Sequence, residues 1–360
     1  MAEAKSIETL SVLFTAGVVA GTFVSGPFSQ VLPVLLIPLL GAPLLLRERI
    51  ARLREPLSLS VILPLFLLLG LFCALLAGIP GVQQQSALAR TALAAGDKLR
   101  TFLDTLPFAD ERTAPLLKAL LTGDRSALPA QTVAVFRASG ASHLLALSGL
   151  HIGILYLLLD KAGSVLGGSP AAGWIRFAAV VTASGFFTLM TGATPSIVRA
   201  FLFILINELL RLTGRPRKAL RVLCLALLVQ LVLDPGVVRS TGFQLSYLAM
   251  AGIFLLYPIL ERWYPEGSRW NPLRRLWQSA ALAISCQLFT APLAWYRFHS
   301  FPRYFLLTNL LAVPLTTGVM FSAVATLTLG VLGICPALLI TTTDGLCRLL
   351  LNVLEVIASL

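Results

Sequence analysis

Charged side chains are scarce in this sequence. Only 12% of its 360 residues are Asp, Glu, Lys or Arg, whereas 57% are hydrophobic and the mean hydropathy is +0.86. An average soluble domain carries roughly twice that share of charge, so a soluble globular fold is excluded. Many apolar runs approach the ~20 residues that cross ~30 Å of hydrocarbon. The sequence predicts an all-α, polytopic membrane protein with about ten transmembrane helices.

The sequence also lacks the spacings of a metal site or a disulfide framework. Its five cysteines lie scattered in apolar segments, no CxxC or HExxH motif occurs, and there are three histidines. Disulfide and metal sites need close, matched spacings, so we interpret the cysteines as small buried hydrophobic residues. We therefore expect no metal ion and no other cofactor.

Acidic residues are fewer than basic ones, 16 against 28, which gives a net charge of +12. The basic residues gather in short turns between apolar segments, as the enrichment of Lys and Arg in cytoplasmic loops predicts. One such turn contains Arg47, Arg49, Arg52 and Arg54. Because this turn is expected in the cytoplasm, the N-terminus is expected there too. We therefore expect a multi-pass protein of the bacterial inner membrane. The charge by itself indicates topology and not a substrate.

We expect four regions: N-terminal transmembrane helices in 1–80, extracytoplasmic, periplasmic amphipathic helices in 81–142, a second membrane block in 143–333, and a last span or interfacial helix in 334–360. The run 304–332 is too long for one untilted span, and Pro314 and Gly318 predict a broken or re-entrant helix. The other predicted spans are 10–26, 31–46, 57–79, 144–159, 171–190, 197–212, 220–233, 242–260 and 276–296.

The segment His143-Leu-Leu-Ala-Leu-Ser148-Gly149-Leu-His151-Ile-Gly153 places polar side chains in an apolar run. A polar group without a partner in hydrocarbon costs ~2–7 kcal/mol, so such residues are rarely incidental. Ser148 and His151 are three residues apart, which predicts that they share one face of a helix. Gly149 and Gly153 would allow another helix to approach that face closely.

Further polar residues lie in the later predicted spans. Arg199 either snorkels to the interface or faces a hydrated path that attracts an anionic substrate. Gln244 and Ser246 either form hydrogen bonds between helices or line a polar channel. Glu208, three residues before Arg211, predicts a local ion pair.

A set of short motifs, in order along residues 115–332, resembles the ComEC-type competence family. The motifs are Leu-Leu-Thr-Gly123-Asp124-Arg125-Ser126, Phe136-Arg-Ala-Ser-Gly140, His143-Leu-Leu-Ala-Leu-Ser148-Gly149-Leu-His151, Pro195 with Arg199-Ala200, Gly214-Arg215, Asp234-Pro235 and Gly242-Phe243-Gln244-Leu245-Ser246. The resemblance implies that 143–333 form an inner-membrane channel through which one strand of DNA enters the cytoplasm during natural transformation. It implies no catalytic residue in this domain.

The resemblance also implies partners: single-stranded DNA, a competence DNA receptor, a cytoplasmic helicase and membrane lipids. Candidates for lining the channel or binding the strand are Ser148, His151, Arg199, Gln244 and Ser246, because single strands are held by basic grooves and aromatic stacking. Family members often carry an OB-like and a metallo-β-lactamase-like domain. We expect neither here, since 81–142 is short and helical and no histidine- and aspartate-rich run follows. Strand degradation would then come from another protein or would not occur.

Two other functions stay open from the sequence. The first is a transporter or flippase of another polyanionic or lipid-linked substrate on the same scaffold. The second is an intramembrane hydrolase that uses Ser148 and His151. The hydrolase is disfavoured because neighbours on one helical turn seldom present the base correctly, and Ala146 stands where intramembrane serine proteases usually carry Gly. We therefore expect no enzymatic activity.

Overall fold

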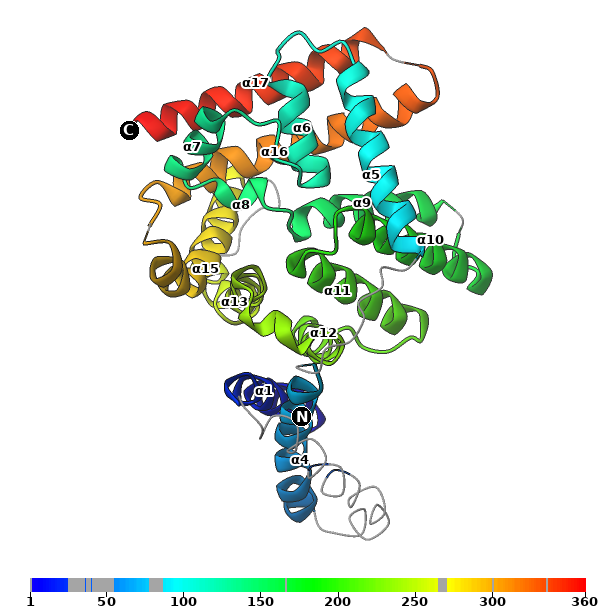
Figure 1. The fold of residues 1–360 in the computed structure, drawn as a ribbon, viewed down its shortest axis with the longest axis vertical. Helices are drawn as coiled ribbons and strands as arrows, with labels where there is room; N and C mark the ends of the chain where they lie inside the picture. Colours follow the sequence, from blue (N-terminus) through cyan, green and yellow to red (C-terminus); the bar gives the residue numbers. More distant parts are fainter. Residues whose placement is uncertain are drawn as a thin grey trace. The chain divides into compact units, whose positions relative to one another are not determined.

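The computed structural model describes residues 2–24, 36, 40, 55–77, 87–165, 167–264, 271–299, 301–334 and 336–360. Over these residues the secondary structure is helical throughout, without a strand, and the predicted all-α class is confirmed (Figure 1). The helices are α1 (Ala2–Phe23), α4 (Glu55–Ala77), α5 (Ala87–Thr105), α6 (Thr113–Thr122), α7 (Ala130–Ala138), α8 (Ser142–Leu145), α9 (Gly149–Ser164), α10 (Pro170–Met190), α11 (Pro195–Leu212), α12 (Ala219–Leu233), the 3₁₀ helix η1 (Pro235–Arg239), α13 (Thr241–Leu255), α14 (Tyr257–Glu261), α15 (Pro272–Phe298), α16 (Phe305–Val331) and α17 (Ala337–Ser359).

Four stretches of helix among the described residues are long and apolar enough to cross a membrane. They are Pro170–Met190, Thr241–Glu261, Phe305–Val331 and Ala337–Ser359, and shorter apolar helices occur at Ile7–Phe23, Pro64–Leu75 and Ala219–Leu233. Among the described residues the number of such helices is therefore four and not the predicted ten or so, and Ala219–Leu233, with 15 residues, is too short to cross an untilted bilayer. The predicted span 31–46, apart from positions 36 and 40, and the basic turn after it lie outside the described residues.

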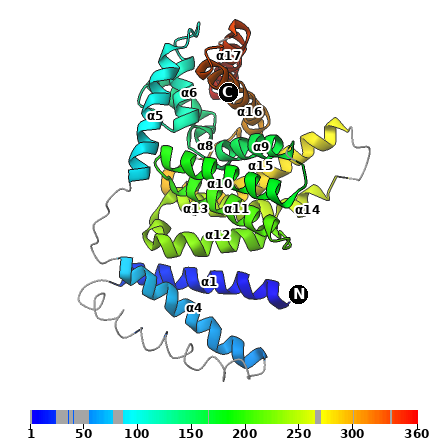
Figure 2. The same cartoon turned by 90° about the vertical axis from the view of Figure 1, so that its right-hand side faces the viewer.

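The chain divides into two compact units. The first contains Met1–Gln84 and Leu202–Gln244, and the second contains Gln85–Phe201 and Leu245–Leu360. In the first unit α1 packs against α4 and α12 (Figure 2). A Cβ atom at Gly17 of α1 would lie 1.9 Å from the carbonyl oxygen of Leu67, and one at Gly70 of α4 would lie 2.1 Å from that of Phe14. These glycines bring the two helix backbones into direct contact, as small residues do in membrane helix pairs.

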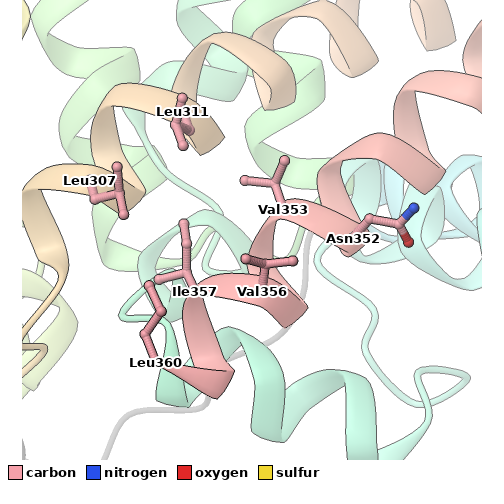
Figure 3. Close-up of a pocket in the computed structure, with 7 residues that line it drawn as sticks. All are labelled: Leu307, Leu311, Asn352, Val353, Val356, Ile357 and Leu360. Atoms are coloured by element: carbon pink, nitrogen blue, oxygen red, sulfur yellow. The ribbon is translucent and has the colours of Figure 1, made fainter.

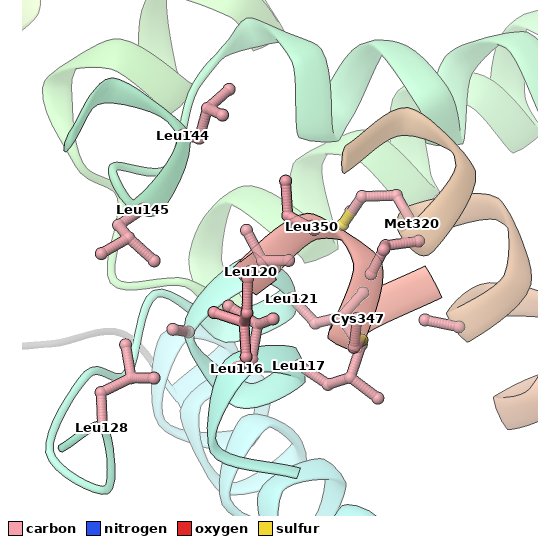
Figure 4. Close-up of a cluster of buried hydrophobic side chains, with 14 of the residues drawn as sticks. Leu116, Leu117, Leu120, Leu121, Leu128, Leu144, Leu145, Met320, Cys347 and Leu350 are labelled. Atoms are coloured by element: carbon pink, nitrogen blue, oxygen red, sulfur yellow. The ribbon is translucent and has the colours of Figure 1, made fainter. Parts of the chain in front are cut away.

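The hydrophobic core of the second unit joins segments that are far apart in the sequence. Figure 4 shows Leu116, Leu117 and Leu120 of α6 beside Met320 of α16 and Leu350 of α17. The amphipathic helices expected in 81–142 are present as α5, α6 and α7. Leu103 of α5, the leucines of α6 and Phe136 of α7 are buried in a core that α16 and α17 share.

Polar contacts fix α17 to the loop before α6. The Asp344 carboxylate of α17, 4% exposed, accepts hydrogen bonds from Thr113 Oγ1 at 2.6 Å, from Asp110 N at 3.2 Å and from Arg348 at 3.0 Å. Arg112 bonds Asp110 and reaches Glu355 at 3.1 Å. The acidic and basic residues of α17 thus face protein partners, because a buried carboxylate needs hydrogen bonds to compensate its lost hydration.

Three details of the sequence interpretation need correction. The predicted span 144–159 does not begin at the motif, because α8 ends at Leu145 and α9 begins only at Gly149. The predicted break in 304–332 is absent: α16 runs for 27 residues through Pro314, which membrane helices tolerate. The third detail concerns the predicted span 242–260: it is confirmed as the stretch Thr241–Glu261, which is long and apolar enough to cross a membrane, but its helix is interrupted at Leu256, two residues before Pro258, whose ring nitrogen has no hydrogen to donate.

Candidate functional site

The motif Gly123 to Ser126 holds the segment that leads into α9. Gly123 ends α6 in the left-handed conformation at φ 79°, and a Cβ atom there would lie 2.5 Å from Leu147 Cδ1. Arg125 Nε donates a hydrogen bond to the Leu145 carbonyl oxygen at 3.1 Å. Gly123 and Arg125 therefore hold the chain at Leu145 and Leu147, just before Ser148. Only glycine adopts the positive φ at position 123 without strain.

The Asp124 carboxylate closes its own turn. It accepts a hydrogen bond from Ser126 N at 2.9 Å and lies 3.5 Å from the Arg100 guanidinium. The backbone hydrogen bond from Ser126, followed by the charges of Arg100 and Lys118, lowers the pKa of Asp124 below its usual value. The carboxylate thus stays ionised and stabilises the turn; it does not act as a proton donor near neutral pH.

Gly140 and His143 belong to a second packed turn. Gly140 has φ 81°, and a Cβ atom there would lie 2.4 Å from Pro302 Cβ. His143 Nδ1 lies 3.2 Å from the Gly140 carbonyl oxygen. These two motif residues shape the chain between α7 and α8.

Ser148 and His151 form the N-terminal cap of α9. Ser148 is extended, with φ −133° and ψ 174°, and its Oγ accepts a hydrogen bond from Leu150 N at 3.2 Å. His151 Nδ1 accepts one from Ser148 N at 3.2 Å, so each residue satisfies a backbone group of the other. The two are neighbours as predicted, but Ser148 precedes the helix and does not share a helical face with His151.

The cap arrangement bears on the hydrolase interpretation. Ser148 Oγ lies 3.2 Å from His151 Nδ1, within hydrogen-bonding distance. However, a neutral imidazole has one lone pair at Nδ1, and here the backbone N–H of Ser148 also points at it. His151 is 2% exposed and its Nε2 has no hydrogen-bond partner among the described residues. The pair is better suited to starting a helix than to proton transfer.

Arg199, in the first turns of α11, lies beside the start of α9. Its Nη2 is 3.4 Å from the position of a Cβ atom at Gly149, and its guanidinium carbon is 6.0 Å from the centre of the Tyr247 ring. Arg199 is 7% exposed, and its Nε is buried without a hydrogen-bond partner within the described residues. The snorkelling interpretation is therefore wrong here, since the side chain does not extend into solvent.

The sequence analysis did not identify Tyr247 of α13 as a candidate site residue. It directly follows the motif Gly242-Phe243-Gln244-Leu245-Ser246, and that position was the available signal. Its ring faces a buried cation in the structure, at a distance typical of a cation–π interaction.

Gln244 and Ser246 occupy different surroundings. Gln244 lies in the first unit, where its Nε2 donates a hydrogen bond to the Val238 carbonyl oxygen at 2.8 Å. Ser246 is half-buried on α13 within the second unit. Gln244 therefore bonds its own connecting segment. The expected Glu208–Arg211 ion pair is confirmed, at 3.5 Å.

A cavity of about 260 Å³ lies between α16 and α17, at some distance along the chain from the motif residues (Figure 3). Its walls are Leu307, Leu311, Asn352, Val353, Val356, Ile357 and Leu360. None of the predicted site residues lines it. In the described part of the chain no three His, Cys, Asp or Glu side chains cluster in a way that could hold a metal ion.

The fold and this site define a helical membrane protein in which a buried arginine and a tyrosine adjoin the capped start of a glycine-containing helix. The family model described as "Competence protein" matches residues 120–360. The chain belongs to the competence protein family.

Curated relatives are similar in sequence to this chain over part of their length. The chain is 29% identical to ComE operon protein 3 of Bacillus subtilis over 205 residues, 56% of this chain and 24% of that protein. It is 28% identical over 201 residues to the protein YcaI of Escherichia coli, 54% of this chain and 26% of that protein. It is 29% identical over 205 residues to Competence protein ComA of Neisseria gonorrhoeae, 55% of this chain and 28% of that protein. The match thus spans about a quarter of each relative, and no solved structure is similar.

Proposed function

We propose that this chain forms the core of a channel that passes single-stranded DNA across the bacterial inner membrane into the cytoplasm during natural transformation. The N-terminus lies in the cytoplasm in this proposal, and the chain transports without catalysing a reaction. The family match and the relatives named for competence support a role in DNA uptake. The observation that carries the proposal is the Arg199–Tyr247 pair beside the cap formed by Ser148 and His151.

This pair offers the two side-chain types that hold single strands. A guanidinium attracts the phosphate backbone, and an aromatic ring stacks on bases of any sequence. Arg199 lies within one of the motifs by which the sequence resembles the family, and Tyr247 directly follows another. A channel for a polyanion needs a mildly positive path, and Arg199 supplies a cation within the apolar body of the second unit.

Burial of the site implies that transport involves movement. His151 and Arg199 are 2% and 7% exposed, so a strand can reach them only when the helices around α9 separate. We infer that the structure corresponds to a closed state. Opening would be coupled to partners, namely a DNA receptor that delivers the strand and a cytoplasmic helicase that draws it inward.

Uptake of labelled DNA tests the proposal. A strain that lacks the gene should take up no DNA into the cytoplasm, and the wild-type chain should restore uptake. Arg199→Ala and Tyr247→Ala should each lower uptake at least tenfold with normal amounts of protein in the membrane. The matched control is Arg297→Ala, because Arg297 also lies over a tyrosine, at 5.9 Å from the ring of Tyr296, but at an exposed end of α15.

Two results would overturn the proposal. Uptake that is unaffected by deletion of the gene would remove the channel function and favour a transporter or flippase of another polyanionic or lipid-linked substrate. Normal uptake in both Arg199→Ala and Tyr247→Ala would show that this site does not contact the strand.

A further inference from the structure

Arg199 carries a charge that the described residues do not neutralise. A guanidinium stays protonated in proteins, and a buried ion without a counter-ion is costly. Around Arg199 the structure shows the Tyr247 ring but no carboxylate in contact, and Nε is buried without a hydrogen bond. A cation–π interaction offsets only part of the free-energy cost of burying an ion. A bound anion would therefore stabilise this environment.

The start of α9 adds a second positive element at the same place. The helix spans 16 residues, and the partial positive charge of its dipole lies at its start, Gly149. A Cβ atom built at Gly149 would lie 3.4 Å from Arg199 Nη2, so the guanidinium is next to this end of the helix. The N–H groups of Leu150 and His151 already bond Ser148, so the helix contributes its dipole, while the guanidinium can donate hydrogen bonds to an oxyanion.

The glycines of α9 leave room for such an anion. A Cβ atom at Gly153, one turn beyond Gly149 on the same face, would meet no heavy atom within 4 Å. Gly149 itself has no side chain to fill the space in front of the guanidinium. The predicted role of Gly153 in close helix packing is thus not seen, and the open volume lies along the face that Arg199 borders.

We propose that Arg199 and the first turn of α9 form a binding site for a phosphate oxyanion, either the phosphodiester of a nucleic acid strand or that of a lipid headgroup. Use of the site by a DNA strand rests on the function proposed above, but anion binding does not. Tyr247 positions the guanidinium, and the capping by Ser148 and His151 keeps the helix start in place.

The test uses the purified full chain in mild detergent and inorganic phosphate as the probe. Phosphate should raise the Tm of the wild-type protein in a saturable way, beyond the effect of chloride at the same ionic strength, because a ligand that binds the folded state stabilises it. Arg199→Gln should weaken apparent phosphate affinity at least tenfold, whereas Arg297→Gln should leave it unchanged. A wild-type protein without a phosphate-specific shift would overturn the proposal.

A second pair of variants covers the case in which Arg199→Gln fails to fold. Gly149→Val keeps the arginine but fills the space before it, and should abolish the phosphate shift. Gly345→Val places the same side chain on α17, away from α9 and where no atom lies within 4 Å, and should keep the shift. Equal shifts in the two glycine variants would contradict the site.

Competition identifies the natural source of the phosphate. Displacement of bound phosphate by a short single-stranded oligonucleotide, but not by phosphatidylglycerol, would assign the site to the strand. The reverse would assign it to a lipid headgroup. Phosphate binding in a protein whose deletion leaves DNA uptake intact would support the site while refuting the proposed channel.

Discussion

Replacing Asp344 with alanine should loosen the attachment of α17 to the loop that precedes α6. The mutation removes the acceptor of three hydrogen bonds, from Thr113 Oγ1, Asp110 N and Arg348. Thr113 is 1% exposed, so its hydroxyl group would be left without this partner in a buried place. Arg348 loses less, because its side chain is 52% exposed and water can solvate its charge.

The expected cost follows from these environments. An unsatisfied buried donor costs about 1–3 kcal/mol, and the half-buried Asp110 N–H adds about 1 kcal/mol. The Arg348 pair adds at most about 1 kcal/mol because it is largely exposed. We therefore expect Asp344→Ala to lower the free energy of unfolding by about 2–5 kcal/mol.

Denaturant unfolding in detergent, followed by tryptophan fluorescence, measures this difference. Hydrogen exchange localises it, since the Asp110 amide should exchange much faster in the variant. Asp97→Ala is the matched control: Asp97 is 69% exposed and pairs with Arg100 on the surface of α5, so its loss should cost less than about 0.5 kcal/mol. Equal stabilities of the Asp344 and Asp97 variants would refute the reasoning.

Three further predictions follow from the same structure. Arg112 hydrogen-bonds Asp110 and so lowers the pKa of that carboxyl; the folded protein should therefore lose stability as the pH falls below about 4 towards the folded pKa, and Arg112→Gln should flatten that part of the stability–pH curve. Gly123→Ala should lower the free energy of unfolding, measured by thermal unfolding, by at least about 1–2 kcal/mol, and it should also reduce DNA uptake. Gly167→Ala is the control: Gly167 has φ 82° and no neighbour within 4 Å, so this variant should show only the cost of backbone strain and normal DNA uptake. Ser148→Ala should destabilise the protein by about 0.5–2 kcal/mol and Ser148→Asn by much less, as thermal unfolding can show, because Asn also caps helices; equal losses would argue against the capping role.

Local signals made most of the helices predictable. The stop at Thr122 and Gly123, and the end of α7 before Gly140, follow from glycines that adopt positive φ after a helix. The apolar runs of α10, α11, α12 and α15 were found because helix formation there depends on residues near in sequence. The number of membrane crossings was not predictable in the same way, because an apolar run does not reveal where a helix is interrupted.

The start of α9 illustrates where sequence reasoning failed. The apolar run on both sides of Ser148 suggested one continuous helix from 144. Arg125 instead bonds the Leu145 carbonyl oxygen and Gly123 packs against Leu147, so the chain leaves the helix before Ser148. Both contacts join residues about 20 positions apart, and no local pattern indicates them.

Composition and short motifs were enough to establish the apolar, helical character of this protein, its family, and the polar residues within its apolar segments. Those properties depend on residues that are near one another in the sequence. The burial of Arg199 against Gly149 and Tyr247, and the contacts of the charged residues of α17 with α6 and the loop before it, became visible in the folded chain. Whether a charge meets solvent, a carboxylate or an aromatic ring depends on how distant helices pack, and that packing balances the free energies of burial and hydrogen bonding over the whole unit.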